Sequence, residues 1–467
     1  MKTIDLLRKG QLTGIQRLDL AEGLTEFPLE ILDLADSLEI LNLTGNCLKQ
    51  LPDEFGRLKK LRILFLSNNQ FETVPEVLSQ CPQLSMVGFK SNQIKTLPEN
   101  ALPPLVRWLI LTHNRLQTLP ASIGNLTRLQ KLMLAGNELR SLPDELANCK
   151  NLELIRLAAN QLPALPVWLF DLPRLSWLAY SGNPFCQSAD SETRSSDPTP
   201  SNTTLKNIDW KDLAIGEMLG QGASGVIYKA IWKNSLPTES IEVAAKPVAA
   251  KQVAVKLFKG DITSDGLPLD EMAACIAAGD HPNLVQVLGK VINHPQGSAG
   301  LVFSLISPAY RNLGNPPSFE SCTRDTYPPE AAFTLPVILR ITQGIASATA
   351  HLHDRGILHG DLYAHNILVD ETGNSLMGDF GAACFFDPAD PPQAAAPSDR
   401  VLSRSFQLLE VRAFGCLLED LLDRCSSETD ETEAIDQLRQ LQQDCMNSNP
   451  HQRPLFIEIC DRLAAIG

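Results

Sequence analysis

The second half of the chain carries residues whose types and spacing suit chemistry on phosphate groups. A glycine-rich stretch comes first, with the residues Gly220, Gln221, Gly222, Ala223, Ser224, Gly225 and Val226. Glycine lets backbone amides approach phosphate oxygens closely because it has no side chain. Farther along, Asp361 and Asn366 lie five residues apart, and Asp379 follows Asp361 by eighteen residues. Carboxylate and amide oxygens bind Mg²⁺, and a carboxylate can accept the proton of a hydroxyl group.

Three lysines could supply a cation next to such phosphates, and each follows an alanine by two residues. They are Lys246, Lys251 and Lys256. Lys246 precedes a proline, which a central strand tolerates badly because proline cannot donate to the ladder. Only Lys256 lies in an apolar run typical of a buried strand, and that run also contains Ala254. We therefore place Lys256 in a strand and interpret most of residues 233–250 as a loop inserted before it.

The first half of the chain repeats a short apolar pattern. Seven asparagines recur at spacings of 23, 23, 22, 23, 23 and 23 residues, each closing the pattern L-x-x-L-x-L-x-x-N: Asn46, Asn69, Asn92, Asn114, Asn137, Asn160 and Asn183. The apolar residues five and three positions before each asparagine alternate as in a short strand with one buried face. The asparagine amide can satisfy backbone groups inside a stack of such strands. Leu18, Leu20 and Gly23 fit one unit earlier, which predicts eight stacked repeats, because a unit this short cannot bury its apolar face alone.

The residues six and four positions before each asparagine should point away from the core, onto the face that the strands line. Several are large and apolar, and we expect them to form a surface that binds a protein partner. The candidates are Phe65, Met86, Trp108, Ile110, Met133 and Trp177. The alternative is that long neighbouring side chains cover these groups, or that they are ordinary scattered surface residues.

Charge and composition exclude several classes of partner and site. The formal net charge is −14 and no basic run occurs, so we expect neither nucleic acid nor an anionic membrane as a partner. No apolar stretch has the length of a membrane span, and the N-terminus has no signal-peptide core, so we expect a cytoplasmic protein. The 11 cysteines are dispersed and none forms C-x-x-C, which indicates reduced thiols instead of disulfides or a zinc site.

A stretch of different composition, residues 187–207, separates the two halves. It is rich in Ser, Thr, Asp and Pro and nearly free of large apolar residues, so it cannot bury enough surface to order itself. We expect it to be a flexible linker. Because 467 residues also exceed the usual size of one core, the sequence predicts a domain over 1–186 and another over 208–467.

Both halves resemble known families. Over residues 12–185 the repeats are similar to the leucine-rich repeat family. Residues 208–467 resemble the protein-kinase family through the glycine loop, His281-Pro282-Asn283, the run from His359 to Asn366, and Gly378-Asp379-Phe380-Gly381. The resemblance implies an α/β leucine-rich-repeat solenoid, with parallel strands on its concave face, followed by a two-lobed α+β protein kinase fold.

The kinase resemblance implies ATP and Mg²⁺ as cofactors and gives the candidate residues their roles. Lys256 would hold the α- and β-phosphates. Asp361 would accept the proton of a protein hydroxyl group, and Asn366 and Asp379 would hold magnesium. The implied activity is ATP-dependent transfer of the γ-phosphate to serine or threonine in preference to tyrosine, with the repeats recruiting a substrate or regulator.

The resemblance also places a carboxylate on the next helix as the catalytic partner of Lys256. Glu271 lies ten residues before His281, where kinases commonly place this glutamate. The rival is the adjacent Asp270. We choose Glu271 because of this spacing.

The sequence departs from the kinase pattern at several positions. Gly360 stands where many kinases have arginine, and Tyr363 and His365 stand where kinases place a lysine or arginine near the γ-phosphate. No A-P-E motif follows the D-F-G, and Glu410 replaces the aspartate that normally braces the catalytic loop. These departures keep two other functions open: a pseudokinase scaffold, and a small-molecule kinase, because H-G-D-x-x-x-x-N resembles the aminoglycoside phosphotransferases. Residues 311–330 match no motif.

Overall fold

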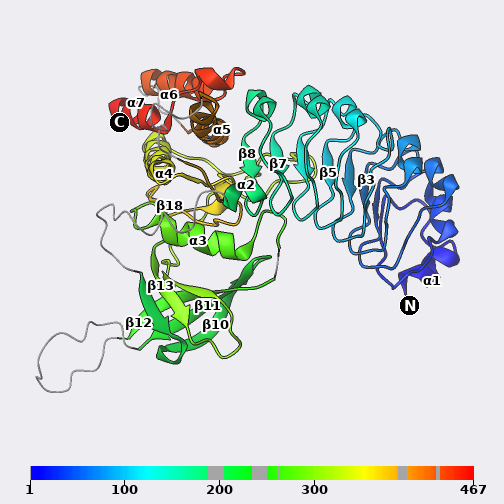
Figure 1. The fold of residues 1–467 in the computed structure, drawn as a ribbon, viewed down its shortest axis with the longest axis horizontal. Helices are drawn as coiled ribbons and strands as arrows, with labels where there is room; N and C mark the ends of the chain where they lie inside the picture. The colour runs from blue at the N-terminus through cyan, green and yellow to red at the C-terminus, as the bar shows by residue number, and fades with distance from the viewer. Residues whose placement is uncertain are drawn as a thin grey trace, which may run out of the picture. The chain divides into compact units, whose positions relative to one another are not determined.

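The computed structural model describes residues 2–187, 205–233, 250–260, 262–387, 397–426 and 432–466, which group into two compact units (Figure 1). The repeat unit comprises Met1–Ser188 together with Pro317–Arg324 and Asn447–Gln452. The second unit comprises Ala189–Pro316, Asp325–Met446 and Arg453–Gly467. Most of the linker predicted over 187–207 lies outside the described residues, as do Lys246 and most of the loop predicted over 233–250.

The repeat unit is built on one parallel sheet of eight strands in chain order (Figure 1). The strands are β1 (Arg17–Asp19), β2 (Ile40–Asn42), β3 (Ile63–Phe65), β4 (Met86–Gly88), β5 (Trp108–Ile110), β6 (Lys131–Met133), β7 (Leu154–Arg156) and β8 (Trp177–Ala179). Their middle residues, such as Leu41, Leu64 and Leu109, are fully buried. The eight strands confirm the eight repeats that the period of the sequence predicts.

The repeat unit also contains short helices. They are α1 (Thr3–Arg8), the 3₁₀ helices η1 (Leu29–Leu34), η2 (Asp53–Arg57), η3 (Glu76–Gln80), η4 (Ala121–Asn125), η5 (Asp144–Asn148) and η6 (Val167–Asp171), and α2 (Pro184–Gln187). The 3₁₀ helix η10 (Pro450–Gln452), near the end of the sequence, also belongs to this unit. Each helix from η1 to η6 directly follows a proline. The fixed φ of proline favours the extended entry into each turn.

The repeating asparagines form a ladder inside the repeat unit. The side-chain nitrogen of Asn137 donates to the carbonyls of Leu111 and Leu134 at 2.9 Å each, and its side-chain oxygen accepts from the amide of Leu116 at 3.1 Å. The same pattern recurs at Asn46, Asn69, Asn92, Asn114, Asn160 and Asn183. Each asparagine therefore satisfies backbone groups that the short strands leave unpaired, as the sequence predicts.

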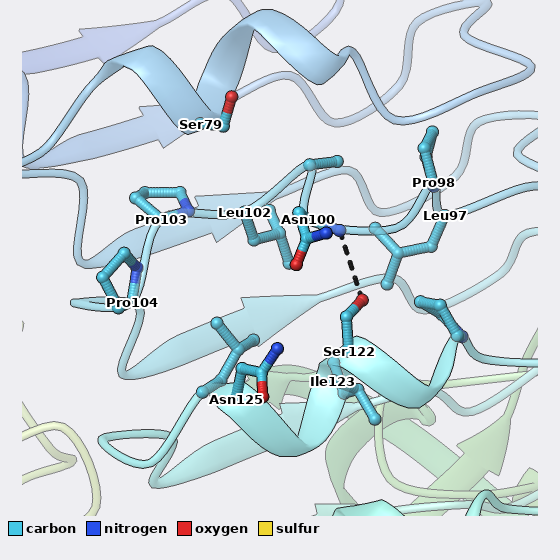
Figure 2. Close-up of a pocket in the computed structure, with 13 residues that line it drawn as sticks. Ser79, Leu97, Pro98, Asn100, Leu102, Pro103, Pro104, Ser122, Ile123 and Asn125 are labelled. Carbon is cyan, nitrogen blue, oxygen red and sulfur yellow. Dashed lines mark hydrogen bonds between the residues drawn. The ribbon is translucent and has the colours of Figure 1, made fainter.

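The 22-residue repeat between β4 and β5 departs from the others. Within this described stretch no 3₁₀ helix forms between η3 and η4, and the segment contains three prolines and a left-handed residue, Asn100, at φ +56°. The backbone amide of Asn100 donates to the hydroxyl group of Ser122 at 3.2 Å (Figure 2). A cavity of about 300 Å³ remains beside this segment, because a shortened turn fills less space than a full helical one (Figure 2).

The second unit opens with a six-stranded sheet in the order β10-β11-β12-β14-β13-β9. The strands are β9 (Lys206–Asp209), β10 (Leu213–Gln221), β11 (Gly225–Trp232), β12 (Lys251–Phe258), β13 (Val287–Ile292) and β14 (Gly300–Ser304). β9 pairs in parallel with β13 and starts at Lys206, inside the stretch predicted as linker. The other neighbours pair antiparallel. Val253, Val255 and Val302 are fully buried, because they form the apolar face of this sheet.

The rest of the second unit is mainly helical (Figure 1). Its helices are η8 (Trp210–Asp212), α3 (Pro268–Ala278), α4 (Leu335–Asp354), η9 (Ala364–Asn366), α5 (Pro397–Leu422), α6 (Thr432–Cys445) and α7 (Phe456–Ile466). Its short strands are β15 (Arg311–Asn312), β17 (Ile367–Val369) and β18 (Ser375–Met377) in one sheet, and β16 (Ile357–Leu358) and β19 (Cys384–Phe385) in another. Ile338, Ile341 and Ile345 recur at helical spacing and bury one face of α4. Within the described part of the chain, no helix has the length and apolar character that crossing a membrane requires.

Candidate active site

Lys256 and Glu271 form an ion pair. Lys256 lies in β12, and Glu271 lies in the first turn of α3. The ammonium group of Lys256 donates to the Glu271 carboxylate, whose side chain is only 3% exposed. Burial raises the pKa of Glu271, and the positive charge of Lys256 opposes this shift. Lys251 is the exposed first residue of β12, so the geometry favours Lys256 as the lysine of the site.

The glycine-rich stretch joins β10 to β11 beside a cavity of about 960 Å³. The part from Gly222 to Gly225 lines this cavity, whereas Gly220, Gln221 and Val226 lie in the adjoining strands and are not among its lining residues. A Cβ atom at Gly225 would lie 2.4 Å from the carbonyl oxygen of Leu257, so no side chain fits there. A Cβ atom at Gly222 would meet open space. Because Gly222 and Gly225 have no side chains, a ligand in the cavity can approach the backbone of this loop closely.

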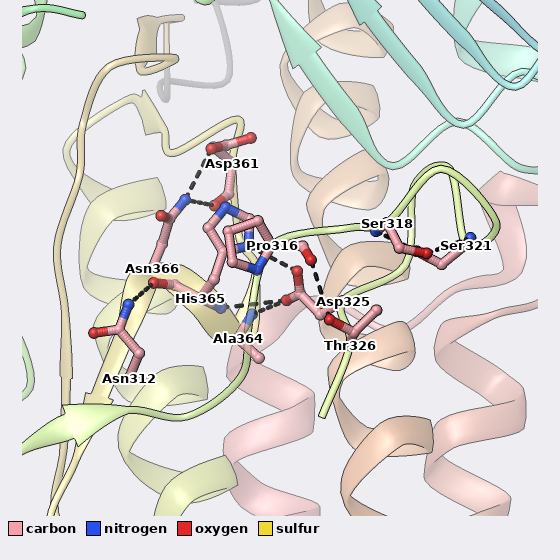
Figure 3. Close-up of polar contacts among 10 residues, drawn as sticks. All are labelled: Asn312, Pro316, Ser318, Ser321, Asp325, Thr326, Asp361, Ala364, His365 and Asn366. Atoms are coloured by element: carbon pink, nitrogen blue, oxygen red, sulfur yellow. Dashed lines mark hydrogen bonds and ion pairs between the residues drawn. The ribbon is translucent and has the colours of Figure 1, made fainter. Parts of the chain in front are cut away.

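Asp361 and Asn366 are tied together in the catalytic loop, which we define as residues 359–366. The side-chain nitrogen of Asn366 donates to the Asp361 carboxylate at 2.8 Å and to its carbonyl at 3.0 Å (Figure 3). The side-chain oxygen of Asn366 is thereby left for another partner, and Asn366 and Asp379 both line the cavity. Asp379 has φ +56°, a left-handed conformation that costs a non-glycine residue about 1 kcal/mol or more and is frequent at functional sites.

Glu410, in α5, braces the start of the catalytic loop. Its carboxylate is 1% exposed and accepts from the backbone amides of His359 at 3.2 Å and Gly360 at 2.8 Å. Nε2 of His353 donates to it at 2.8 Å. Burial alone would raise the pKa of Glu410, but the hydrogen bond and charge of His353 bring that pKa below its usual range. Glutamate therefore holds the loop although the kinase pattern has aspartate here.

Gly360 adopts φ +72°, in the left-handed region that residues with a Cβ atom rarely occupy. The hydrogen bond that its backbone amide donates to the Glu410 carboxylate holds this conformation. Glycine at the position of the usual arginine is therefore matched to the backbone conformation of the loop.

Gly360→Ala is expected to lower the free energy of unfolding by about 1 kcal/mol, because alanine must adopt this strained φ. It should also lower the rate of any reaction that depends on the loop. Gly297→Ala is the matched control, since Gly297 has φ +70° and a Cβ atom added there would have no other atom within 4 Å. The control should lose similar stability in urea titrations and keep the wild-type rate. Equal rates in both variants would contradict this interpretation.

Tyr363 and His365 differ in their position relative to the cavity. Tyr363 is only 5% exposed, whereas His365 lines the cavity, and their rings lie 5.0 Å apart between centroids. Burial alone would lower the pKa of His365, but the hydrogen bond to Asp325 and its charge raise that pKa overall. His365, whose ring lines the cavity, is therefore held by the carboxylate of Asp325.

The donor set around the cavity fits ATP with Mg²⁺. Lys256 supplies a cation, the bare glycine loop supplies backbone amides, and the side-chain oxygens of Asn366 and Asp379 are hard ligands of the kind that Mg²⁺ prefers. Ala254 and Leu368 add apolar walls, which suit a purine ring.

The six residues proposed for the concave face separate into two groups. Phe65, Trp108 and Ile110 are partly exposed. Met86, Met133 and Trp177 are 3%, 8% and 1% exposed, so the expectation that they form an open surface is wrong for these three. Neighbouring residues also contact Trp108 and Phe65 on the strand face of the repeats. Lys131 places its ammonium group 4.2 Å from the centre of the Trp108 ring, and a Cβ atom at Gly88 would lie 2.8 Å from Phe65.

The repeat unit also contains the segment Pro317–Arg324, which we call the concave-face segment. The Phe319 ring lies 5.9 Å from the Phe65 ring, between centroids. The guanidinium group of Arg107 donates to the carbonyl of Glu320 at 3.2 Å, and the hydroxyl group of Thr323 donates to the Glu153 carboxylate. Glu153 is 3% exposed. The concave-face segment thus contacts side chains that lie in the repeat strands or directly beside them.

Some residues of the site have no counterpart in the sequence interpretation. The segment from Phe303 to Ile306 and Leu368 line the cavity. Both could have been found, because they follow or form apolar strands at the positions that a kinase resemblance implies. Asp325 binds the catalytic loop. It lies in a stretch without any motif, so the sequence contains no signal for it.

Comparisons with known proteins agree with both halves of the structure. A family model described as protein tyrosine and serine/threonine kinase matches residues 213–395. A leucine-rich repeat model matches residues 24–71, 36–94, 104–162 and 127–185. A solved structure of a leucine-rich repeat protein from Leptospira interrogans is 32% identical, covering 37% of this chain and 50% of that one, with a TM-score of 0.32.

Three relatives are similar to more than a third of the chain. A protein of Acanthamoeba polyphaga mimivirus named as a serine/threonine-protein kinase/receptor is 27% identical over 57% of this chain and 17% of its own length. A probable serine/threonine-protein kinase of Dictyostelium discoideum is 30% identical, covering 39% and 30%. Fibroblast growth factor receptor 1 of Xenopus laevis is 25% identical, covering 55% and 35%. The chain thus spans about a third or less of the length of these relatives. The two family models show that this chain has leucine-rich repeats followed by a protein kinase domain.

Proposed function

We propose that this protein is an active ATP-dependent protein kinase that phosphorylates serine or threonine in preference to tyrosine. The observation that carries the proposal is the Lys256–Glu271 ion pair on the same cavity as Asn366 and Asp379. The preference for serine or threonine is supported by the names of two of the relatives.

The residues of the chain divide the work of phosphate transfer between them. Lys256, held by Glu271, binds phosphate oxygens, and the glycine loop covers them and excludes water. Bound ATP with Mg²⁺ supplies the transferable phosphate, and Asn366 and Asp379 would hold the metal. Asp361 is positioned by the side-chain amide of Asn366 and receives the proton of the acceptor hydroxyl group.

The test is incubation of the full chain with γ-phosphate-labelled ATP and Mg²⁺, together with casein as a general acceptor. We expect label on the protein itself or on casein. The variant Asp361→Asn should bind nucleotide with unchanged affinity and transfer no label, because it loses the proton acceptor but keeps the shape of the side chain. Phosphoamino-acid analysis of the product then separates serine or threonine from tyrosine.

A pseudokinase scaffold is the second candidate, and one observation favours it. Tyr363 stands where serine/threonine kinases place a lysine, and its side chain is buried. A neutral, buried side chain gives the γ-phosphate less electrostatic stabilisation. Nucleotide binding in calorimetry without any transfer of label would select this function over the active kinase.

We also propose that the repeats recruit a protein substrate or regulator, and that the protein works in the cytoplasm. Support for recruitment comes from Phe65, Trp108 and Ile110, which are large, apolar and partly exposed, and which lie on β3 and β5, two strands on either side of β4. Support for the cytoplasm, a reducing compartment, comes from the cysteines, because all 11 are free thiols in the structure.

Trp108→Ser is expected to weaken binding of such a partner by about 2 kcal/mol or more, with little change in thermal stability. Trp177→Ala is the matched control, because its ring is buried and its loss should cost about 3–5 kcal/mol of stability. Affinity capture with the full chain identifies the partner, and calorimetry measures each variant. A melting temperature for Trp108→Ser as low as that of the control would show that Trp108 belongs to the core.

A further inference from the structure

Residues 311–330 match no kinase motif, and the two ends of this segment that belong to the second unit, 311–316 and 325–330, contact the catalytic loop. The backbones of Asn315 and Thr326 exchange two hydrogen bonds, at 2.8 and 3.0 Å, and close the base of this segment. On one side of this base, the side-chain nitrogen of Asn312 donates to the carbonyl of His365 at 2.8 Å (Figure 3). On the other side lies Asp325.

The carboxylate of Asp325 accepts three hydrogen bonds from the catalytic loop (Figure 3). One oxygen accepts from the backbone amides of Ala364 at 2.5 Å and His365 at 3.3 Å. The other accepts from Nδ1–H of His365 at 2.7 Å. The Asp325 side chain is only 3% exposed. A carboxylate this deeply buried with three donors is a strong local constraint.

Asp325 acts where a side-chain cap would act, at the start of the short helix η9. The short helix η9 starts at Ala364, and its N-cap residue, Tyr363, makes no side-chain capping bond. The first amides of a helix have no acceptor inside the helix. Asp325, 39 residues earlier in the chain, supplies that acceptor from another segment.

We propose that Asp325 is a positioning residue for phosphate transfer, which fixes the backbone between Asp361 and Asn366 and orients His365 toward the cavity. The rate effect of this residue rests on the proposed kinase activity, whereas its hold on the loop does not. The Asn366 amide carries the constraint onward, since it donates to the Asp361 carboxylate at 2.8 Å. A displaced η9 would therefore move both the proton acceptor and a magnesium ligand.

The experiment compares Asp325→Asn and Asp325→Glu with the wild-type chain. Hydrogen exchange read by mass spectrometry reports on a peptide that spans the catalytic loop, and needs no activity. We expect the loop amides to exchange about tenfold faster in Asp325→Asn. The NH₂ group of the new side chain is a donor, so it cannot accept a hydrogen bond from the loop as the carboxylate oxygen does. We expect kcat to fall about tenfold or more, with nucleotide affinity and KM for ATP within about twofold of wild type.

Asp325→Glu keeps the carboxylate on a longer stem and should restore part of the rate and of the protection. Glu330→Ala is the matched control, because Glu330 is an exposed carboxylate of the same segment, residues 311–330. It should leave exchange and kcat unchanged.

Three results would overturn the proposal. The first is unchanged loop exchange in Asp325→Asn, and the second is a variant that loses nucleotide affinity together with rate. The third is loss of the cooperative melting transition, which would make Asp325 part of the general core. If the wild type transfers no phosphate, the kinase proposal fails, and the exchange data alone decide whether Asp325 holds the loop.

Discussion

Lys256→Met is expected to lower the rate of phosphate transfer by about 10²–10³-fold while the protein keeps a cooperative melting transition. The change removes the cation that Glu271 holds beside the cavity, and methionine retains most of the apolar stem. Asp361→Ala should have a similar effect, because the acceptor hydroxyl group then has no base. Initial rates with labelled ATP measure both.

Lys251→Met is the matched control for this prediction. Lys251 begins the same strand, β12, and is exposed. Its replacement should leave the rate within about twofold of wild type. If Lys251→Met is inactive and Lys256→Met is active, then Lys251, and not Lys256, is the lysine that binds the phosphates.

Glu410→Ala is expected to destabilise the protein by about 3–5 kcal/mol, because it leaves two buried backbone amides and His353 without their acceptor. Glu410→Gln should lose less, since its amide oxygen can still accept one of these bonds. Urea titrations with tryptophan fluorescence give the two free energies. Stability of Glu410→Ala within about 1 kcal/mol of wild type would contradict the role of Glu410 as a brace.

The same residue gives a pH dependence with a definite sign. The pKa of Glu410 is lower in the folded protein than its ordinary value of 4.5. Its stabilising contribution is therefore complete above pH 4.5 and is lost as pH falls through the lower folded-state pKa. The difference in stability between wild type and Glu410→Gln should shrink over that acidic range. A difference that grows on acidification would show that the carboxylate is not the stabilising species.

The repeat unit could be predicted in detail because its period is written into the sequence. An asparagine every 22 or 23 residues fixes the depth of each strand, and so Asn137 and its equivalents occupy the ladder that the pattern implies. Exposure on the concave face could not be predicted. Burial of Met86, Met133 and Trp177 depends on which other side chains reach them, and a repeat pattern contains no information about distant segments.

The fixed spacing of the motifs predicts the candidate catalytic residues, and the apolar character of its strand separates Lys256 from Lys251. The sequence also showed that Gly360 and Glu410 depart from the kinase pattern. It did not show that the two departures meet in one hydrogen bond, or that Gly360 is left-handed. Asp325 was beyond sequence reasoning, because its role arises from a contact across 39 residues in a segment without a motif.

The concave-face segment has a consequence for any protein that binds the repeats at Phe65. Pro317–Arg324 is joined to the chain at both ends, so it is present at this face at an effective concentration that dilution does not reduce. An incoming ligand must compete with it, and its apparent dissociation constant is the intrinsic one divided by the fraction of molecules in which the face is open. Phe319→Ala, by weakening this internal competitor, should therefore tighten binding at the face without any new contact to the ligand.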